Sequence, residues 1–227
     1  MPTTISSPLL NRLTRYLNYL TNLPEHQPAT TSSTMIGGAL DLNDVQVRKD
    51  LAIISNKGKP KIGYVTSDLI SDIEHFLGHD NISEAVLVGA GNLGRALLSY
   101  GNFEKYGLDI VAAFDSSPAL IDRHINGRAI LDAGRITDLC KRMNIKIGII
   151  TVPDIYAQKI CDALVDGGVR GIWNFAPVNI RAPENVVIKN EDMAASLAIL
   201  TKQLAESLAN DEIDQLEEAT MENKFKK

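Results

Sequence analysis

The sequence predicts a two-part α/β chain, in which a small helical domain precedes a doubly wound parallel sheet and a C-terminal helix. Amphipathic helical spacing fills the first third of the chain, strands then alternate with helices, and a last helical pattern follows the final strand. The length of 227 residues and the hydrophobic content of 44% suit one or two packed domains. We expect domain boundaries at residues 1–78, 79–191 and 192–210, with a charged tail at 211–227.

Cysteine usage and the apolar runs narrow the possible classes of protein. Cys140 and Cys161 each lie in a helical pattern without metal-site spacing, so neither a metal site nor a disulfide framework is expected. The segment from Met1 to Pro8 lacks the apolar region of a signal peptide, and no apolar run is long enough to cross a bilayer. We therefore expect a cytoplasmic protein that does not associate with membranes.

Four amphipathic segments in the first domain predict helices at residues 8–20, 34–40, 43–54 and 67–77. A tight turn at Leu42-Asn43 separates the second helix from the third, which is typical of a helix-turn-helix. The segment that follows the third helix is short, turn-rich and basic, as the β-hairpin of a wing would be. The pattern predicts a winged-helix domain of the kind that binds DNA.

Positive charge gathers in the third helix and the wing, although the net charge of the whole chain is −5. Between residues 43 and 64 the chain carries five lysines and arginines against two aspartates. Such cations contact DNA phosphates, whereas Arg48 and Gln46 are expected to read base edges. The alternative interpretation is a solvated surface. The residues predicted to bind DNA in this segment are Gln46, Arg48, Lys49, Lys57, Lys59 and Lys61.

A strand, a glycine-rich turn, a helix and a second strand follow one another in residues 84–115. In the turn, Gly89 allows a tight bend, Gly91 lets a pyrophosphate approach the backbone, and Gly94 lets the helix pack closely. The helix N-terminus offers N–H groups to the phosphates. This order predicts a dinucleotide-binding unit, the alternative being a turn without a ligand. The predicted loop is Gly89-Ala90-Gly91-Asn92-Leu93-Gly94.

Asp115 ends the second strand of this unit, about 20 residues after Gly94, as the acidic residue of such units does. Its carboxylate can accept hydrogen bonds from both ribose hydroxyls and would repel a 2′-phosphate, which favours NADH and NAD⁺ over their phosphorylated forms. Further strands are predicted at residues 146–151, 171–175 and 185–188, with helices between them, so the second domain is predicted to be a Rossmann sheet.

The motifs of the two domains together resemble the Rex family of redox-sensing transcriptional repressors. They include Val45-Gln46-Val47-Arg48-Lys49-Asp50-Leu51, the glycine-rich loop and Asn174-Phe175-Ala176-Pro177, and the resemblance covers roughly residues 8–205. It implies a homodimer whose winged helices bind a palindromic double-stranded operator. NADH would release the DNA, and NAD⁺ would compete for the same site. The helix near residues 192–209 would be swapped into the partner subunit, which explains an amphipathic helix with no domain to bury it.

The resemblance also implies roles for single residues. Tyr100 would help to switch between states, or else is a packing aromatic residue, and Asp192 would contact the partner, or else is a helix N-cap. Ser33, which opens the second helix, would contact DNA. The further nucleotide contacts implied are Ser116, Thr151, Val152, Pro153, Asn174, Phe175, Ala176 and Met193.

The wing departs from the usual pattern of the family. An aromatic pair is replaced by Ile53-Ile54, and an arginine and a glycine are replaced by Pro60 and Lys61. The segment keeps its usual length, so we expect the hairpin to survive, while the operator sequence stays open.

Two alternative functions follow from the same sheet. An NAD-dependent oxidoreductase needs an acid or base beside the nicotinamide. The four histidines lie in or beside predicted loops or the helix before the linker, and neither Thr151-Val152-Pro153 nor the Asn-Phe-Ala-Pro segment carries a lysine or histidine. No catalytic residue is therefore predicted. The other alternative is a CoA- or nucleotide-binding subunit of a larger enzyme. Asp115 and the basic winged helix both argue against this alternative.

Overall fold

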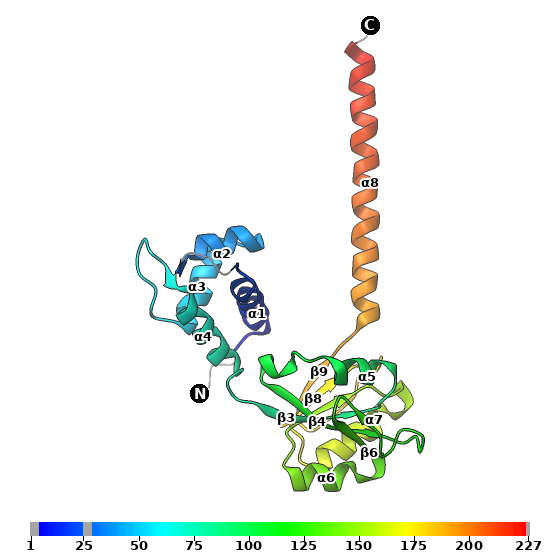
Figure 1. Cartoon of the computed structure of the whole chain (residues 1–227). Coiled ribbons are helices and arrows are strands. Elements are labelled where there is room, and N and C mark those ends of the chain that lie inside the picture. Colours follow the sequence, from blue (N-terminus) through cyan, green and yellow to red (C-terminus); the bar gives the residue numbers. More distant parts are fainter. Residues whose placement is uncertain (1–4, 25–28, 226–227) are drawn as a thin grey trace. The chain divides into compact units, whose positions relative to one another are not determined.

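The computed structural model describes residues 5–24 and 29–225, with side chains described up to residue 209 (Figure 1). The chain divides into two compact units, which confirms the predicted order of a helical domain before an α/β sheet. Each unit has its own hydrophobic core. The first unit consists of Met1–Glu84 and Tyr100–Asp109, and the second of Ala85–Ser99 and Ile110–Lys227.

Four helices pack around one core in the first unit (Figure 1). Side chains cap two of them, since Ser32 Oγ accepts from the Met35 amide at 3.2 Å and Asn43 Oδ1 accepts from the Val45 amide at 2.9 Å. Leu13 lies on the packed face of the first helix and is fully buried. The four helices are α1 (Ser7–Thr21), α2 (Ser33–Leu40), α3 (Asp44–Ile54) and α4 (Thr66–Leu77).

The wing is built differently from the predicted hairpin. Strand β2 (Tyr64–Val65) pairs antiparallel with β1 (Thr30–Thr31), which lies before α2. The turn just before β2 is closed by Lys59 and Gly63, which exchange backbone hydrogen bonds of 2.8 and 2.9 Å. The predicted segment therefore supplies the turn and one strand of the wing. Its partner strand was missed because two residues are too few to show strand alternation.

A buried carboxylate connects α1 to α3. Asp50 is only 2% exposed and accepts hydrogen bonds from Arg12 Nε at 2.6 Å, the Tyr16 hydroxyl at 2.8 Å and Gln46 Nε2 at 2.8 Å. Burial opposes ionisation of Asp50, but these hydrogen bonds outweigh it and hold the pKa of Asp50 below its usual range. Burial, together with the hydrogen bond to Asp50, raises the pKa of Tyr16 to about 12.

The second unit contains a seven-stranded sheet in the order β5-β6-β4-β3-β7-β8-β9. The pairs β3–β7, β4–β6, β7–β8 and β8–β9 are parallel, so the carboxyl ends of these strands share the edge where α/β sheets bind ligands. The strands are β3 (Ser83–Val88), β4 (Leu108–Asp115), β5 (His124–Ile125), β6 (Arg128–Asp132), β7 (Ile147–Ile150), β8 (Gly171–Asn174) and β9 (Val187–Asn190).

Helices connect these strands and complete the core. Cys140 and Cys161 are buried free thiols in this core, and burial raises the pKa of each to about 11, which suits packing residues. The helices are α5 (Asn92–Ser99), α6 (Ile136–Met143) and α7 (Asp154–Asp166), with the short 3₁₀ helix η2 (Ala133–Arg135). Helix α5 begins at Asn92, inside the glycine-rich loop. A further 3₁₀ helix, η1 (Phe103–Tyr106), belongs to the segment of the chain assigned to the first unit.

Strand β5 lies in residues 116–127, which the sequence predicts as a polar loop, and β6 follows where no strand was predicted. They pair antiparallel around a turn at Asn126 and Gly127, whose φ angles of 46° and 77° are both left-handed. An Asn-Gly pair between short apolar stretches is a strong hairpin signal, so the sequence did contain the information.

The C-terminal helix α8 (Met193–Phe225) is longer than predicted, because the expected charged tail continues it as far as Phe225. Every residue from 192 to 209 is exposed in the single chain. Leu197, Leu200 and Leu204 are each more than half exposed, although their spacing is that of a packed helix face. Within the described residues, no helix combines the length and the apolar character needed to cross a bilayer.

Candidate functional site

The glycine-rich loop connects β3 to α5 at the carboxyl edge of the sheet. Gly89 has a φ of 102°, and a Cβ there would lie 2.8 Å from the carbonyl oxygen of Thr151. A Cβ on Gly94 would collide with the carbonyl oxygen of Gly89. The tight turn and the close helix therefore both require glycine. A Cβ on Gly91 would meet no atom within 4 Å, so the backbone there is open to an approaching group.

Asp115 lies against this loop at the end of β4. Its Oδ2 accepts from the Ala90 amide at 2.7 Å, and its Oδ1 accepts from the Ser117 amide at 2.8 Å. Each carboxylate oxygen has about two acceptor positions, so both can still accept a hydroxyl. Asp115 thus shapes the loop and remains able to bind a ribose. Ser116, which follows it, is exposed.

Strand β7 brings a second predicted segment to the same edge. The Thr151 hydroxyl lies 2.7 Å from the Gly89 carbonyl oxygen and 3.0 Å from that of Val88, so it contacts the base of the loop. Val152 is half-buried, and Pro153 is exposed just before α7. Because β3 neighbours β4 on one side and β7 on the other, the strand order reverses here, which is where doubly wound sheets bind ligands.

Asn174 occupies the end of β8 and is fully buried. Its Oδ1 accepts from the Ala176 amide at 3.0 Å, and its Nδ2 donates to the Val178 carbonyl oxygen at 2.8 Å and to Asn190 Oδ1 at 2.9 Å. The side-chain amide is thus engaged within the protein and holds the turn that follows β8. This turn presents half-buried Phe175 and buried Ala176.

The residues expected to act in switching and dimerisation lie at ends of helices. Tyr100 follows α5, is 48% exposed and packs its ring 4.8 Å from that of Phe103. Asp192 Oδ1 accepts from the Ala195 amide at 2.8 Å, so the N-cap interpretation of Asp192 describes its contact in the single chain. Met193 begins α8 and is 62% exposed.

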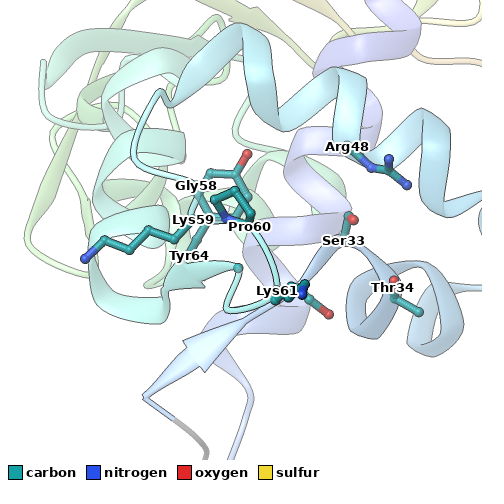
Figure 2. A pocket seen from close by; sticks show the side chains of 10 residues that line it. Ser33, Thr34, Arg48, Gly58, Lys59, Pro60, Lys61 and Tyr64 are labelled. Carbon is teal, nitrogen blue, oxygen red and sulfur yellow. The ribbon is translucent and has the colours of Figure 1, made fainter.

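The DNA-binding residues predicted for the first unit come together only in part. A pocket of about 540 Å³ lies between α2, α3 and the turn of the wing. Figure 2 shows Arg48 and Lys61 on the side of Ser33 and Thr34, whereas the Lys59 side chain extends the opposite way. The lining consists of Ser32, Ser33, Thr34, Arg48, Gly58, Lys59, Pro60, Lys61, Gly63 and Tyr64.

Two residues expected to contact DNA are engaged elsewhere. Gln46 is an exposed residue, but its side-chain amide donates to buried Asp50 one turn further along α3. Lys57 Nζ lies 2.7 Å from Asp72 Oδ1 on α4. Neither lines the pocket. Arg48 keeps an exposed side chain beside Asp44 at 3.2 Å, and Lys49 is exposed.

Sequence reasoning missed the contribution of Ser32, Thr34 and Tyr64 to this pocket. The run of hydroxyl residues before α2 was a usable signal, because a helix N-terminus offers amide and hydroxyl donors to a phosphate. Tyr64 had no such signal, since its place follows from the β1–β2 pairing.

The fold and the two sites define a class: a winged-helix protein that carries a dinucleotide-binding domain in the same chain. The family models agree with this division, because "CoA binding domain" matches residues 80–178 and "Putative DNA-binding protein N-terminus" matches residues 4–52.

Relatives with established names narrow the class. The "Redox-sensing transcriptional repressor Rex" of Bacteroides thetaiotaomicron is 38% identical over 202 residues, which are 89% of this chain and 92% of that protein. A crystal structure of RSP in complex with beta-NAD⁺ and operator DNA superposes with a TM-score of 0.86 at 31% identity, covering 93% of this chain and 98% of that one. RSP in complex with beta-NADH gives 0.83 at 30% identity, with 93% and 99% covered. The chain belongs to the Rex family of redox-sensing transcriptional repressors.

Proposed function

We propose that this protein is a transcriptional repressor that senses the NADH/NAD⁺ ratio, binds a palindromic operator as a homodimer and releases it when NADH binds. The proposal rests on the presence of two features in one chain. One is the winged-helix pocket lined by Arg48, Lys59 and Lys61, and the other is the glycine-rich loop whose Ala90 amide donates to Asp115. Structures of the similar repressor RSP contain beta-NAD⁺ with operator DNA, or beta-NADH.

The nucleotide would bind along the carboxyl edge of the sheet. Open space at Gly91 and the N-terminus of the eight-residue helix α5 suit a pyrophosphate, and the free acceptor positions of Asp115 suit the ribose hydroxyls. The segments at Thr151 and Phe175 would flank the nicotinamide, with Met193 contributed at the start of α8. NADH and NAD⁺ differ by one hydride and one charge on the nicotinamide, so the protein must sense the difference at the nicotinamide end of the nucleotide.

Operator DNA would meet the pocket of the first unit. Arg48 and Lys49 are the exposed cations of α3, and Arg48 is the candidate for a base contact. Lys61 would meet a phosphate together with the hydroxyl of Ser33, and Lys59, whose side chain extends the opposite way, would meet a separate phosphate. In this division residues 1–78 bind DNA, residues 79–191 bind the nucleotide, and residues 211–227 form the tail.

A second copy of the chain is the proposed partner of α8. The row of exposed leucines on residues 192–210 would be covered in the other subunit, which removes apolar area from water. Asp192 would then contact the partner near the nucleotide, and Tyr100 would help to switch between states. We place the dimer in the cytoplasm. Release by NADH requires that NADH bind one state of this dimer more tightly than the other, because equal affinity shifts no equilibrium.

This proposal assigns no catalysis to the chain. The two segments expected beside the nicotinamide carry no lysine or histidine in the sequence, so neither supplies the usual proton donor for a carbonyl substrate. Bound NADH that is not consumed with carbonyl compounds would separate the repressor from an oxidoreductase. Tight binding of CoA would favour the enzyme-subunit alternative instead.

The decisive experiment selects binding sites from a pool of random palindromic duplexes at fixed salt, with NADH, NAD⁺ or neither. We expect one sequence to be enriched, and NADH but not NAD⁺ to release it. The Asp115→Asn variant should bind the same sequence yet require more NADH for release, because the amide loses an acceptor. Asp166→Asn, at the far end of α7 from Pro153, is the matched control. NADH binding without selection of any sequence would contradict the proposal.

A further inference from the structure

The chain leaves the sheet for α8 at a point where β8 and β9 are joined by side chains. Trp173 Nε1 donates to Glu191 Oε1 at 2.9 Å, and the Glu191 amide donates to the Asn174 carbonyl oxygen at 2.8 Å. The side-chain amide of Asn174 donates from its Nδ2 to Asn190 Oδ1 at 2.9 Å. The last residues before α8 are therefore tied to the last residues of β8.

The two side-chain bonds, from Trp173 and from Asn174, lie on opposite faces of the sheet, since successive side chains of a strand alternate. Trp173, Phe175 and Glu191 share one face, and Asn174 and Asn190 share the other. The rings of Trp173 and Phe175 have centroids 4.7 Å apart at an interplanar angle of 49°. The Trp173 ring thus touches Phe175, the proposed neighbour of the nicotinamide, and also hydrogen-bonds Glu191.

Glu191 directly precedes the cap of α8. Asp192 accepts from the Ala195 amide at 2.8 Å, and all residues from 192 to 209 are exposed in the single chain. A helix capped this close to the sheet takes its direction from the residues at its base. A displacement of Phe175 has a contiguous route to that base, through the Trp173 ring and the Glu191 carboxylate.

We propose that Glu191 is a positioning residue that, through Trp173, couples the nucleotide site to the direction of α8. The inference rests on the proposed function, since it assumes that NADH contacts Phe175 and that α8 meets a second copy. A hydrogen bond to a carboxylate is directional, so the carboxylate follows the indole N–H when the ring moves. The bond would be stronger in one dimer state than in the other, so that its loss would change the equilibrium between them.

Lys189 provides a matched control on the same strand. Its Nζ lies 3.9 Å from Glu191 Oε1, and its side chain is 71% exposed. Exposed pairs at this distance contribute little. Lys189→Gln therefore changes the charge beside Glu191 and leaves the bond to Trp173 in place.

The test compares five variants of the full-length protein by the ratio of operator affinity without and with NADH. Glu191→Leu removes the acceptor, and Trp173→Phe removes the donor but keeps a ring beside Phe175. Each should lower the ratio about three- to tenfold, the range expected for the loss of one hydrogen bond. Glu191→Gln keeps an acceptor and should restore the ratio, and Lys189→Gln should leave it unchanged. The double variant Trp173→Phe/Glu191→Leu should lose no more than either single one.

Trp173 is the only tryptophan of the chain, so its fluorescence follows the same contact directly. Glu191→Leu should change the emission of the nucleotide-free protein, whereas Lys189→Gln should not. A general loss of stability would instead lower the melting temperature and weaken operator binding with and without NADH alike.

The result that overturns the inference is a Glu191→Leu or Trp173→Phe protein that releases the operator as readily as the wild type. Failure of one variant to fold leaves the other to decide. A wild-type protein that binds NADH without any change in operator affinity would overturn the proposed function, and this inference with it.

Discussion

The two units form their sites by different means. In the second unit the backbone defines the site, because Gly89 and Gly94 are required by close contacts and Asp115 accepts from two backbone amides. In the first unit side chains define it, and neighbouring residues of α3 have opposite roles. Asp50 is buried against α1, whereas Arg48 is exposed beside the pocket.

The difference follows from the geometry of the two elements. A helix turns about 100° per residue, so residues two positions apart in one motif, such as Arg48 and Asp50, point to opposite sides of the helix. A glycine-rich turn after a strand instead presents main-chain groups, whose direction depends little on side-chain identity. The comparison can be tested by changing the residue that each site depends on most.

The largest effect is expected for Asp50→Ala in the helical unit. The substitution leaves the Tyr16 hydroxyl without its partner and the Arg12 guanidinium, whose side chain is 24% exposed, without its carboxylate. Breaking a buried pair in this way costs about 3–5 kcal/mol, and the partial exposure of Arg12 favours the lower end. Chemical denaturation should show early loss of the helical unit. NADH binding by the second unit should persist.

The dependence of the free energy of unfolding on pH, at acidic pH, tests the same hydrogen-bond network around Asp50. Since the pKa of Asp50 lies below its usual value of 3.8, its contribution is present above that value and is lost as the pH falls through the lowered pKa. The wild type should therefore lose stability as the pH falls below about 4, and Asp50→Ala should lose less. An equal loss of stability in the two proteins at acidic pH would remove Asp50 from this role.

Gly94→Ala should have the next largest effect, in the second unit. Its Cβ would collide with the Gly89 carbonyl oxygen, so the loop must shift, and NADH affinity should fall at least about 100-fold, or roughly 2.7 kcal/mol. Nucleotide-free operator binding should be retained. Titration of Trp173 fluorescence with NADH measures the loss.

Two further glycines serve to separate folding from binding. A Cβ on Gly91 or on Gly101 meets no atom within 4 Å, so both alanine variants should fold normally. Gly91→Ala should still weaken NADH binding, because it narrows the proposed approach to the pyrophosphate, whereas Gly101→Ala should bind as the wild type does. Normal binding by Gly91→Ala would place the phosphates elsewhere.

The same contrast explains what the sequence could predict. The order of strands and helices and the glycine turn were visible because buried runs and glycine spacing are local patterns. The role of Lys57 was not, because its partner Asp72 lies on α4 and is brought close by packing. The pairing of β1 with β2 is similarly nonlocal, whereas the Asn-Gly turn before β6 was a local signal left unused. Gln46 and Asp50 lie four residues apart on α3, so their contact was also a local signal that was not used.

A comparison of Arg48→Ala with Gln46→Ala sharpens the division of α3 into two faces. Arg48→Ala should weaken operator binding by about 1–3 kcal/mol if the guanidinium contacts a base, and should leave the melting temperature unchanged. Gln46→Ala should lower stability by about 1 kcal/mol through the lost bond to Asp50. The preferred operator sequence should survive it. A changed base preference in Gln46→Ala would return this residue to the recognition surface.

The smallest expected effect separates two lysines of the wing. Lys61 lines the pocket, whereas Lys57 is held 2.7 Å from Asp72 on α4. If Lys61 neutralises one phosphate, Lys61→Gln should reduce the slope of log affinity against log salt by about 0.9. Lys57→Gln should change that slope less, because its ammonium already has an acidic partner within the protein. Equal slope changes would mean that Lys57 leaves Asp72 for the DNA, and that both faces of the wing contact the operator.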